Sequence, residues 1–498
     1  MNFNIKKIKS KEPGKTDFPE PATTGFYHGK KFSISLSFSA SIILIILLLV
    51  GIFKAVTSID FKIFLKVAGD ELQIDGYGHS NFLILGTGDK TYDGGNLTDS
   101  IIVASLDDEN KLITMTSIPR DLYVQDEKIG DSRINEVYFN AKTSLGSSNE
   151  GLNYLREKVE IIMGIPIHYW LKVDFTGFKE LVDAIGGIDI SVEQAIYDPN
   201  YPQDNSYGYQ TFSLPAGQRH MDGATALKYA RSRSTTSDFD RAKRQQQIIY
   251  AMKEKALQTE TIIDTNRINS ILQTLRENIE TNITVKEILT LGSIAGDYSP
   301  EQISHRLIHD DPTQCGGFLY PPVRELYGGM AILLPAGGSE FIHLYSDLTF
   351  NTPQIAKENL RLQILNGTKR AGIAGETKQI LQRFCLNVAR YGNGARQDIE
   401  QTTYYYSPNK NDDRKDDRPE TLNFLQKIIP GVESVVIPPE YQEYIQTADI
   451  ILEIGKDYTD SPKYMTDPFN MIFAMPAVAS EAVASEASNL SPSPSPQQ

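Results

Sequence analysis

The chain has 498 residues, of which 40% are hydrophobic and 22% are charged, and its formal net charge is -14. This length is sufficient for two or three domains, and the composition is that of an ordinary globular protein. The acidic balance argues against nucleic acid as the main partner, because proteins that bind nucleic acid present a broad basic surface.

The first long apolar run predicts a membrane anchor. Residues 32–53 contain no charged side chain, and as a helix they would extend about 33 Å, enough to cross a bilayer. Residues 1–31, the expected cytoplasmic tail, contain more lysines than acidic residues. The positive-inside rule then predicts a single-pass protein of the cell membrane whose main domains are extracytoplasmic. A cleaved signal peptide is the alternative, although no clean small-x-small cleavage site follows the run.

The region after the anchor alternates predicted strands with predicted helices. Short apolar runs rich in β-branched residues predict strands at 81–85, 100–106, 112–116 and 188–192. Helical patterns cover 152–163, 178–185, 239–257, 266–279 and 284–295. This alternation predicts an α/β domain at 79–345, with a mixed central sheet covered by helices.

A second, smaller α/β domain is predicted at 361–457. It begins with a strand at 362–365 and ends with a strand at 449–454. Pairs of prolines and glycines in 312–358 indicate a domain edge and linker. We therefore expect each unit to bury its own core. The Ala-, Ser- and Pro-rich residues 476–498 are typical of a disordered tail.

The two cysteines leave two interpretations open. Cys315 and Cys385 form no metal-binding or redox spacing. They form a disulfide if the compartment is oxidising, and otherwise they are buried thiols.

Four arginines lie close together in the sequence and predict a site for a multivalent anion. In an extended segment Arg231 and Arg233 project to the same side. On a helix Arg241, Arg244 and Gln245 share one face. A planar guanidinium has paired donors that match phosphate or carboxylate geometry. An ordinary solvated basic helix is the alternative interpretation.

Three carboxylates follow the first predicted strand on a glycine-rich loop. They are Asp89, Asp93 and Asp99. Mg²⁺, or Mn²⁺ in its place, prefers one or two carboxylates together with phosphate oxygens and water. A metal on this loop and arginines on another segment would together bind a pyrophosphate. The alternatives are a plain turn at Asp93 and a strand-entry cap at Asp99.

Further candidates follow the third predicted strand. Arg120 would lie at the carboxyl end of that strand, where open α/β sheets bind their ligands. Asp121, next in sequence, is a candidate proton acceptor. Arg133 is another candidate anion ligand. Asp238 has an alternative role as the N-cap of the helix that carries Arg241.

Six separated segments carry a resemblance to a known family. They are NFLILGT (81–87), LTDS (97–100), SIPRD (117–121), VDF with LVDAIGGID (173–189), ALKYARSR (226–233) and DFDRAKRQQ (238–246). Their order resembles the LytR-CpsA-Psr family of cell-envelope proteins over residues 79–345. Residues 361–457 are similar to the LytR C-terminal domain, through LNGT (365–368) and GIA (372–374).

The resemblance implies a phosphotransferase that moves a glycopolymer from a polyprenyl-pyrophosphate carrier to peptidoglycan or another envelope acceptor. It also implies Mg²⁺ held by aspartates and pyrophosphate, and arginines around the phosphates. The residues so assigned are Arg120, Asp121, Arg231 and Arg233 for catalysis, Arg133, Arg241, Arg244 and Gln245 for substrate binding, and Asp99 and Asp93 for the metal.

Two positions depart from the family pattern. Gly88 stands where the family usually has an aspartate, and Leu97 stands where it usually has an arginine. Asp93 or Asp89 could replace the first metal ligand, and Asp93 is favoured because the two glycines after it let the loop fold back. A lipid pyrophosphate hydrolase and a non-catalytic scaffold that binds lipid-linked glycans remain as alternatives.

Overall fold

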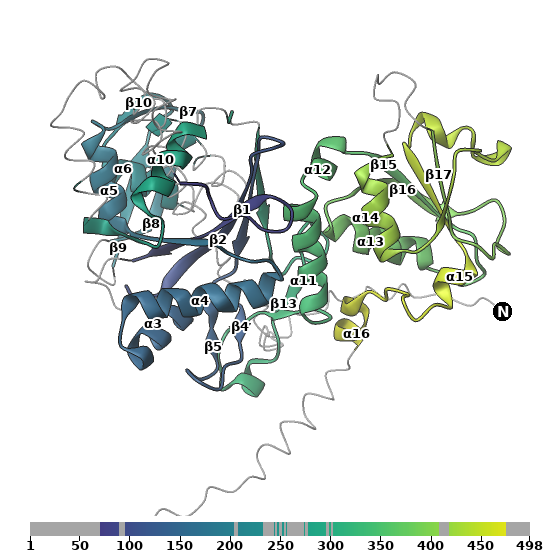
Figure 1. Cartoon of the computed structure of the whole chain (residues 1–498), viewed down its shortest axis with the longest axis horizontal. Helices are drawn as coiled ribbons and strands as arrows, with labels where there is room; N and C mark the ends of the chain where they lie inside the picture. Colours follow the sequence, from purple (N-terminus) through teal and green to yellow (C-terminus); the bar gives the residue numbers. More distant parts are fainter. Residues whose placement is uncertain are drawn as a thin grey trace, which may run out of the picture.

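The computed structural model describes residues 70–88, 95–203, 208–232, 277–294, 302–407 and 418–474, together with a few positions between 244 and 299 (Figure 1). The predicted anchor at 32–53 and both predicted tails lie outside these residues. Within the described part of the chain, no helix combines the length and the hydropathy that a membrane span requires.

A six-stranded mixed sheet forms the centre of the first unit, in the order β11-β6-β1-β2-β3-β12 (Figure 1). Its strands are β1 (His79–Thr87), β2 (Thr98–Asp107), β3 (Leu112–Ile118), β6 (Tyr169–Asp174), β11 (Ile279–Thr281) and β12 (Ile303–Leu307). Strand β1 pairs antiparallel with β2 and parallel with β6. Strand β3 pairs antiparallel with β2 and parallel with β12. The predicted mixed sheet is therefore confirmed.

Both faces of this sheet are buried under helices. Along β1, Phe82 and Ile84 belong to one hydrophobic cluster, whereas Leu83 and Leu85 belong to another, because successive side chains of a strand point to opposite faces. The first face is covered by α5 (Phe175–Ala184), α6 (Gly223–Arg231) and α10 (Val285–Ile294). The second face is covered by α3 (Ile134–Leu145), α4 (Ser148–Met163) and α11 (Ser339–Ser346).

Four two-stranded ribbons surround the sheet. They are β4 (Tyr123–Val124) with β5 (Ser132–Arg133), β7 (Ile188–Val192) with β10 (Gly217–Met221), β8 (Ile196–Pro202) with β9 (Tyr209–Leu214), and β13 (Leu319–Tyr320) with β14 (Leu334–Pro335). The helix predicted at 266–279 differs at its last residue, because β11 begins at Ile279 and pairs with β6. Most of the helix predicted at 239–257 lies outside the described residues.

The second unit is a five-stranded sheet in the order β16-β15-β19-β17-β18. Its strands are β15 (Arg361–Asn366), β16 (Asn387–Asn393), β17 (Thr403–Tyr406), β18 (Val432–Ser434) and β19 (Ile450–Ile454). Its helices are α13 (Ile373–Arg383), α14 (Glu420–Ile428), α15 (Lys456–Thr459) and α16 (Pro468–Ala474). Parallel pairing of β15 with β16 and β19 makes this unit α/β as well.

One of the two large hydrophobic clusters extends across both units, whereas the other belongs to the first unit alone. A single buried cluster runs from Leu83 of β1 through Phe318 to Phe384 at the end of α13. The ring centres of Phe318 and Phe384 lie 5.1 Å apart. Phe341 of α11 stacks on Phe384, with ring centres 6.2 Å apart.

The segment 312–358 is not a linker, contrary to the expectation. It contains β13, β14 and α11, then a π-helix (Asp347–Asn351) and α12 (Gln354–Glu358). The glycine and proline pairs mark its turns, but buried side chains such as Ile342 and Tyr345 follow the last pair. Burial of these side chains converts a predicted connection into part of the core.

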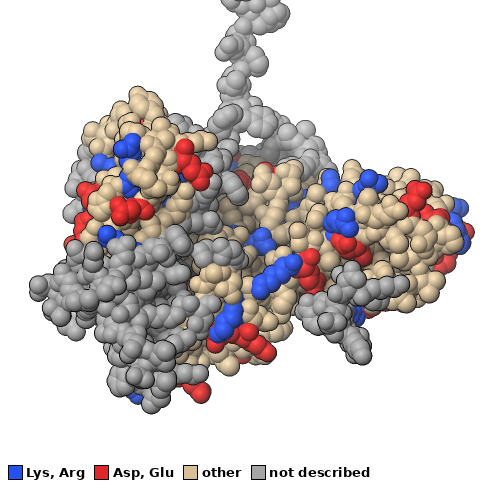
Figure 2. All heavy atoms as spheres, turned by 90° about the horizontal axis from the view of Figure 1, so that it is seen from above, with Lys and Arg blue, Asp and Glu red and all other residues tan. Residues whose placement is uncertain are grey.

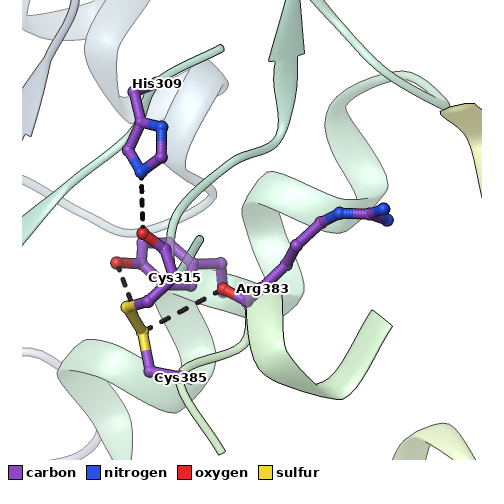
Figure 3. The surroundings of a disulfide bond; sticks show 5 residues. His309, Cys315, Arg383 and Cys385 are labelled. Carbon is purple, nitrogen blue, oxygen red and sulfur yellow. Dashed lines mark hydrogen bonds between the residues drawn. A yellow bond between two sulfur atoms is a disulfide. The ribbon is translucent and has the colours of Figure 1, made fainter. Parts of the chain in front are cut away.

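A disulfide joins the two units and decides between the two interpretations of the cysteines. Cys315 bonds to Cys385, with their Cα atoms 4.6 Å apart (Figure 3). His309 Nε2 lies 2.8 Å from the Cys315 carbonyl oxygen. The backbone N–H of Gly316 donates to the Arg383 carbonyl oxygen at 2.8 Å.

A buried ion pair lies in the same region. The Arg383 side chain, which points away from the disulfide in Figure 3, meets both carboxylate oxygens of Asp467 at 2.8 and 2.7 Å. Its Nε donates to the Pro312 carbonyl oxygen at 2.7 Å. The two charged side chains are 4% and 1% exposed. The paired donors and acceptors of this ion pair are shielded from water. Because Arg383 also contacts Pro312, the pair links the first unit, α13 and the C-terminal segment.

Replacing both cysteines by serine (C315S with C385S) should lower the free energy of unfolding by about 2–5 kcal/mol, because the cross-link restricts the unfolded chain. Urea unfolding of the full-length chain measures this difference. A reductant should shift the wild-type midpoint to that of the double variant and leave the double variant unchanged. Equal midpoints for oxidised wild type and double variant would contradict a stabilising cross-link.

Candidate active site

One edge of the central sheet brings the predicted site residues together. At this edge Thr87, the last residue of β1, pairs with Thr98 of β2 and with Asp174 of β6. The last residue of β3, Ile118, pairs with Ile101 of β2. Adjacent strands lie about 4.8 Å apart, so residues that follow β6, β1 and β3 are within about 15 Å of one another along the edge.

Asp99, a predicted metal ligand, lies on β2 at this edge and is partly exposed. Its Oδ1 accepts a hydrogen bond from Arg120 Nη1 at 3.0 Å and one from Asn135 Nδ2 at 3.3 Å. The backbone N–H of Asn135 donates to the Arg120 carbonyl oxygen at 3.2 Å. These contacts hold the first turn of α3 and the segment after β3 beside Asp99.

Asp121 is buried between two arginines. Arg120 Nε lies 3.6 Å from its Oδ2, and Arg133 Nη1 lies 3.7 Å from its Oδ1. Burial raises the pKa of Asp121 above its ordinary value, although the charges of Arg120 and Arg133 act in the opposite direction. The dominant effect is the loss of water around the ionised carboxylate.

Glu136 is a site residue that sequence reasoning did not assign. Arg133 is the N-cap of α3, and Glu136 is its third residue. The Glu136 carboxylate accepts hydrogen bonds from the Arg133 backbone N–H at 3.1 Å and from Arg133 Nη2 at 2.5 Å. Burial would raise the pKa of Glu136, but the hydrogen bonds from Arg133 outweigh it and lower that pKa. A glutamate at the third position of a helix is a capping signal, but the helix at 134–145 was not among those predicted from the sequence.

These five side chains form a row of alternating charge. They are Asp99, Arg120, Asp121, Arg133 and Glu136. Both arginines of the row therefore have carboxylate partners in the structure. On the face drawn in Figure 2, basic and acidic side chains are similarly interspersed.

Arg231, the last residue of α6, has a different environment. Its guanidinium carbon lies 4.3 Å from the ring centre of Phe175 and 5.6 Å from that of Tyr201. Its Nη1 donates to the Tyr201 hydroxyl at 3.3 Å. Phe175 directly follows Asp174 at the end of β6, so Arg231 lies beside the same sheet edge as Asp99 and Arg120.

Arg244, a predicted substrate ligand, is buried inside the fold. Its Nε donates to the Tyr229 carbonyl oxygen at 3.1 Å and its Nη2 to the Ser232 carbonyl oxygen at 2.7 Å. Ile248 and Met252 are also buried, and positions four residues apart share one helix face. Arg244 therefore lies on the buried face and holds the backbone beside Arg231.

Four predicted site residues lie outside the described part of the chain. They are Asp93, Arg233, Arg241 and Gln245. Asp89 and the expected N-cap Asp238 lie outside it as well.

The mixed sheet, with arginines and carboxylates at one edge, defines an α/β protein with a candidate anion-binding site. Residues 58–324 match the family model described as the LytR_cpsA_psr family. The match covers more than half of the chain, which therefore belongs to the LytR-CpsA-Psr family. Residues 359–458 match the model described as LytR cell envelope-related transcriptional attenuator.

Curated relatives include named transferases. The chain is 36% identical over 208 residues to the polyisoprenyl-teichoic acid–peptidoglycan teichoic acid transferase TagV of Bacillus subtilis, a match that covers 41% of this chain and 50% of TagV. It is 26% identical over 257 residues to the corresponding transferase TagU of Bacillus licheniformis, covering 51% and 76%. It is also 32% identical over 218 residues to the regulatory protein MsrR of Staphylococcus aureus, covering 43% and 60%. The chain thus spans half the length of TagV.

Solved structures are similar over the first unit. The crystal structure of Bacillus subtilis TagV has 28% sequence identity and a TM-score of 0.39, covering 55% of this chain and 97% of that chain. TagT bound to LIIa-WTA has 20% identity and a TM-score of 0.37, covering 56% and 94%.

The raised pKa of Asp121 predicts a pH dependence of stability. The ordinary pKa of an aspartate, 3.8, applies to Asp121 in the unfolded chain, and folding raises it. The folded chain therefore binds this proton more tightly than the unfolded chain does. The resulting stabilisation is complete below about pH 4 and is lost as pH rises through the folded pKa. Asp121→Asn removes this titration, so its melting temperature should fall less than that of the wild type between about pH 4 and 7.

Melting temperatures of the full-length wild type and variant across this pH range provide the measurement. Glu109→Gln, on an exposed turn, is the control and should follow the wild-type curve. Parallel curves for the wild type and Asp121→Asn would show that Asp121 does not titrate in this way.

Proposed function

We propose that the chain is an extracytoplasmic phosphotransferase that moves a glycopolymer from a polyprenyl-pyrophosphate carrier to peptidoglycan or another envelope acceptor. The observation that carries this proposal is the sheet edge where Arg120 and Arg133 flank a buried carboxylate, Asp121, and where Arg231 lies beside Phe175 at the end of β6. The relatives TagV and TagU, whose names describe teichoic acid transfer to peptidoglycan, support it.

Catalysis of phosphoryl transfer consists mainly of positioning the reactants and stabilising charge. Arg120 and Arg231, from opposite ends of the site edge, bind the pyrophosphate oxygens, and Arg133 supports them from α3. Arg233, Arg241 and Gln245 are proposed as further ligands from the segment after α6. Arg244 is proposed to contribute indirectly, by fixing the backbone on either side of Arg231.

Asp121 is proposed to accept the proton of the attacking hydroxyl. The acceptor-sugar oxygen forms a bond to the phosphorus that carries the glycan. The bond from that phosphorus to the bridging oxygen breaks, and polyprenyl phosphate leaves with the electron pair. A raised pKa makes the Asp121 carboxylate a stronger base once it is ionised. The two flanking arginines stabilise its ionised form before the transfer.

A hard divalent cation, Mg²⁺ or Mn²⁺, is proposed to bind at Asp99, although the described residues alone contain no cluster of three or more candidate metal ligands. Asp99 offers a partly exposed carboxylate whose described hydrogen bonds use Oδ1 alone. A side chain at Gly88 would place its Cβ 3.3 Å from the Gly95 Cα, so an aspartate there would be crowded. Asp93, two residues before Gly95, is proposed as the second ligand. When bound, the cation neutralises charge on the pyrophosphate.

The anchor at 32–53 is proposed to hold the site near the membrane that contains the lipid carrier. A non-catalytic scaffold that binds lipid-linked glycans is the second candidate function. It is favoured by the pairing of Arg120 with Asp99 and by Gly88 in place of an aspartate. Hydrolysis of the same lipid pyrophosphate is a catalytic variant in which water replaces the acceptor sugar. Metal-dependent release of products separates an enzyme from a non-catalytic scaffold. The identity of the products separates transfer to a sugar from hydrolysis.

Arg120→Ala or Arg231→Ala should each remove about 2–4 kcal/mol of transition-state stabilisation. This corresponds to a rate loss of about thirty- to a thousand-fold. Lysine should restore little activity, because an ammonium lacks the paired donors of a guanidinium. Transfer of a labelled glycan from its lipid pyrophosphate measures the rate.

Arg219→Ala is the matched control, since Arg219 is hydrogen-bonded to backbone carbonyls on the separate β7–β10 ribbon. Thermal melts establish that each variant is folded. Folded Arg120 and Arg231 variants with wild-type turnover would refute the site.

Asp99→Asn should weaken the response of the transfer rate to added Mg²⁺, because an amide oxygen is a poorer ligand for a hard cation. Asp93→Asn should act in the same direction, whereas Asp89→Asn should be mild. The experiment is a Mg²⁺ titration of transfer at fixed substrate. An unchanged Mg²⁺ response in both the Asp99 and Asp93 variants would contradict the metal assignment without affecting the arginines.

A further inference from the structure

Two aromatic rings from distant segments meet at the Arg231 side chain. Phe175 begins α5 at the end of β6, and Tyr201 lies on β8. The guanidinium carbon is 4.3 Å from the Phe175 ring centre and 5.6 Å from the Tyr201 ring centre. The Tyr201 hydroxyl accepts a hydrogen bond from Arg231 Nη1 at 3.3 Å. Tyr201 itself is 1% exposed, so its ring and hydroxyl have a fixed position.

These contacts fix Arg231 without neutralising its charge. Arg120 pairs with Asp99, and Arg133 pairs with Glu136. Among the described residues, no carboxylate oxygen lies within 4.0 Å of an Arg231 nitrogen. An aromatic face attracts a cation through its quadrupole and leaves the net charge in place. Among the described residues, the contacts of Arg231 are therefore with aromatic rings and a hydroxyl rather than with a carboxylate.

A second contact from the same β8–β9 hairpin holds the next residue. The Ser232 hydroxyl donates to Asp198 Oδ2 at 2.9 Å, and both side chains are buried. Arg244 donates to the carbonyl oxygens of Tyr229 and Ser232 from the other side. The backbone on which Arg231 stands is thus held by the hairpin and by Arg244.

We propose that Phe175 and Tyr201 form an aromatic clamp that orients Arg231 for the pyrophosphate of the lipid-linked substrate. The clamp rests on the proposed function and adds two positioning residues to it. Neither residue contacts the reacting atoms in this role. Its advantage over a carboxylate partner is that the anion does not have to displace a competing negative charge before it meets Arg231.

A purely structural role for Tyr201 is the competing explanation, because this side chain also belongs to the hydrophobic core of the first unit. Tyr201→Phe separates the two roles. It keeps the ring in the core and removes only the hydroxyl that meets Arg231. Phe175→Leu keeps an apolar side chain of similar length and removes the closer ring.

The test is calorimetric binding of inorganic pyrophosphate to the full-length chain, with and without Mg²⁺. Tyr201→Phe should weaken binding about two- to five-fold, as expected for loss of one hydrogen bond. Phe175→Leu should weaken it about three- to thirty-fold, as expected for loss of a cation–π contact. Tyr197→Phe is the matched control, since Tyr197 lies on the same strand but is 57% exposed.

The decisive readout is coupling to Arg231. In an Arg231→Ala background, Tyr201→Phe and Phe175→Leu should cause no further loss of affinity, because the side chain they orient is gone. Equal losses in both backgrounds, or wild-type affinity in both clamp variants, would overturn the clamp while the anion site stands. A wild-type chain that fails to bind pyrophosphate would overturn the proposed function and the clamp together.

Discussion

The pairing of β1 with β2 on one side and with β6 on the other determines where all the site residues lie. This register places Asp99 beside the end of β1 and sets Phe175 one residue beyond the end of β6. The antiparallel pairing of β2 with β3 then brings Arg120 to the same edge. The sheet holds this register because both of its faces are buried, and a slip by one residue would exchange the two sets of side chains between the faces.

At that edge the structure combines two ways of holding an arginine. Arg120 and Arg133 lie in a row of alternating charges, where their carboxylate partners fix them and also compete with any incoming anion. Arg231 is fixed by aromatic rings and a hydroxyl, which do not compete.

Much of this arrangement follows from local sequence pattern. The short apolar runs rich in β-branched residues predicted β1, β2 and β3, and with them the positions of Asp99 and Arg120 at a strand end. The burial of Arg244 was not foreseen, because its position on the helix was read from the charge pattern alone, whereas Ile248 and Met252 mark the same face as buried. Glu136 has a local signal in its capping position, which charge reasoning did not consider.

The shared core was not predictable in the same way. The apolar residues Phe318 and Ile342 lie close in sequence to glycine and proline pairs, and a local pattern does not reveal which distant surface covers them. Local pattern likewise could not show whether Cys315 and Cys385 are bonded, because a disulfide requires two Cα atoms that are close together after folding.

The disulfide also changes what happens when the backbone is cut. Cys315 and Cys385 are separated by 70 positions along the chain, so a peptide bond broken anywhere between them leaves the two fragments covalently joined. Proteases generally cut at exposed turns, and Arg324–Tyr327 is a short 3₁₀ helix within this loop. A chain nicked there keeps its second unit attached to the sheet that carries the site, and only reduction of the disulfide would remove the covalent connection.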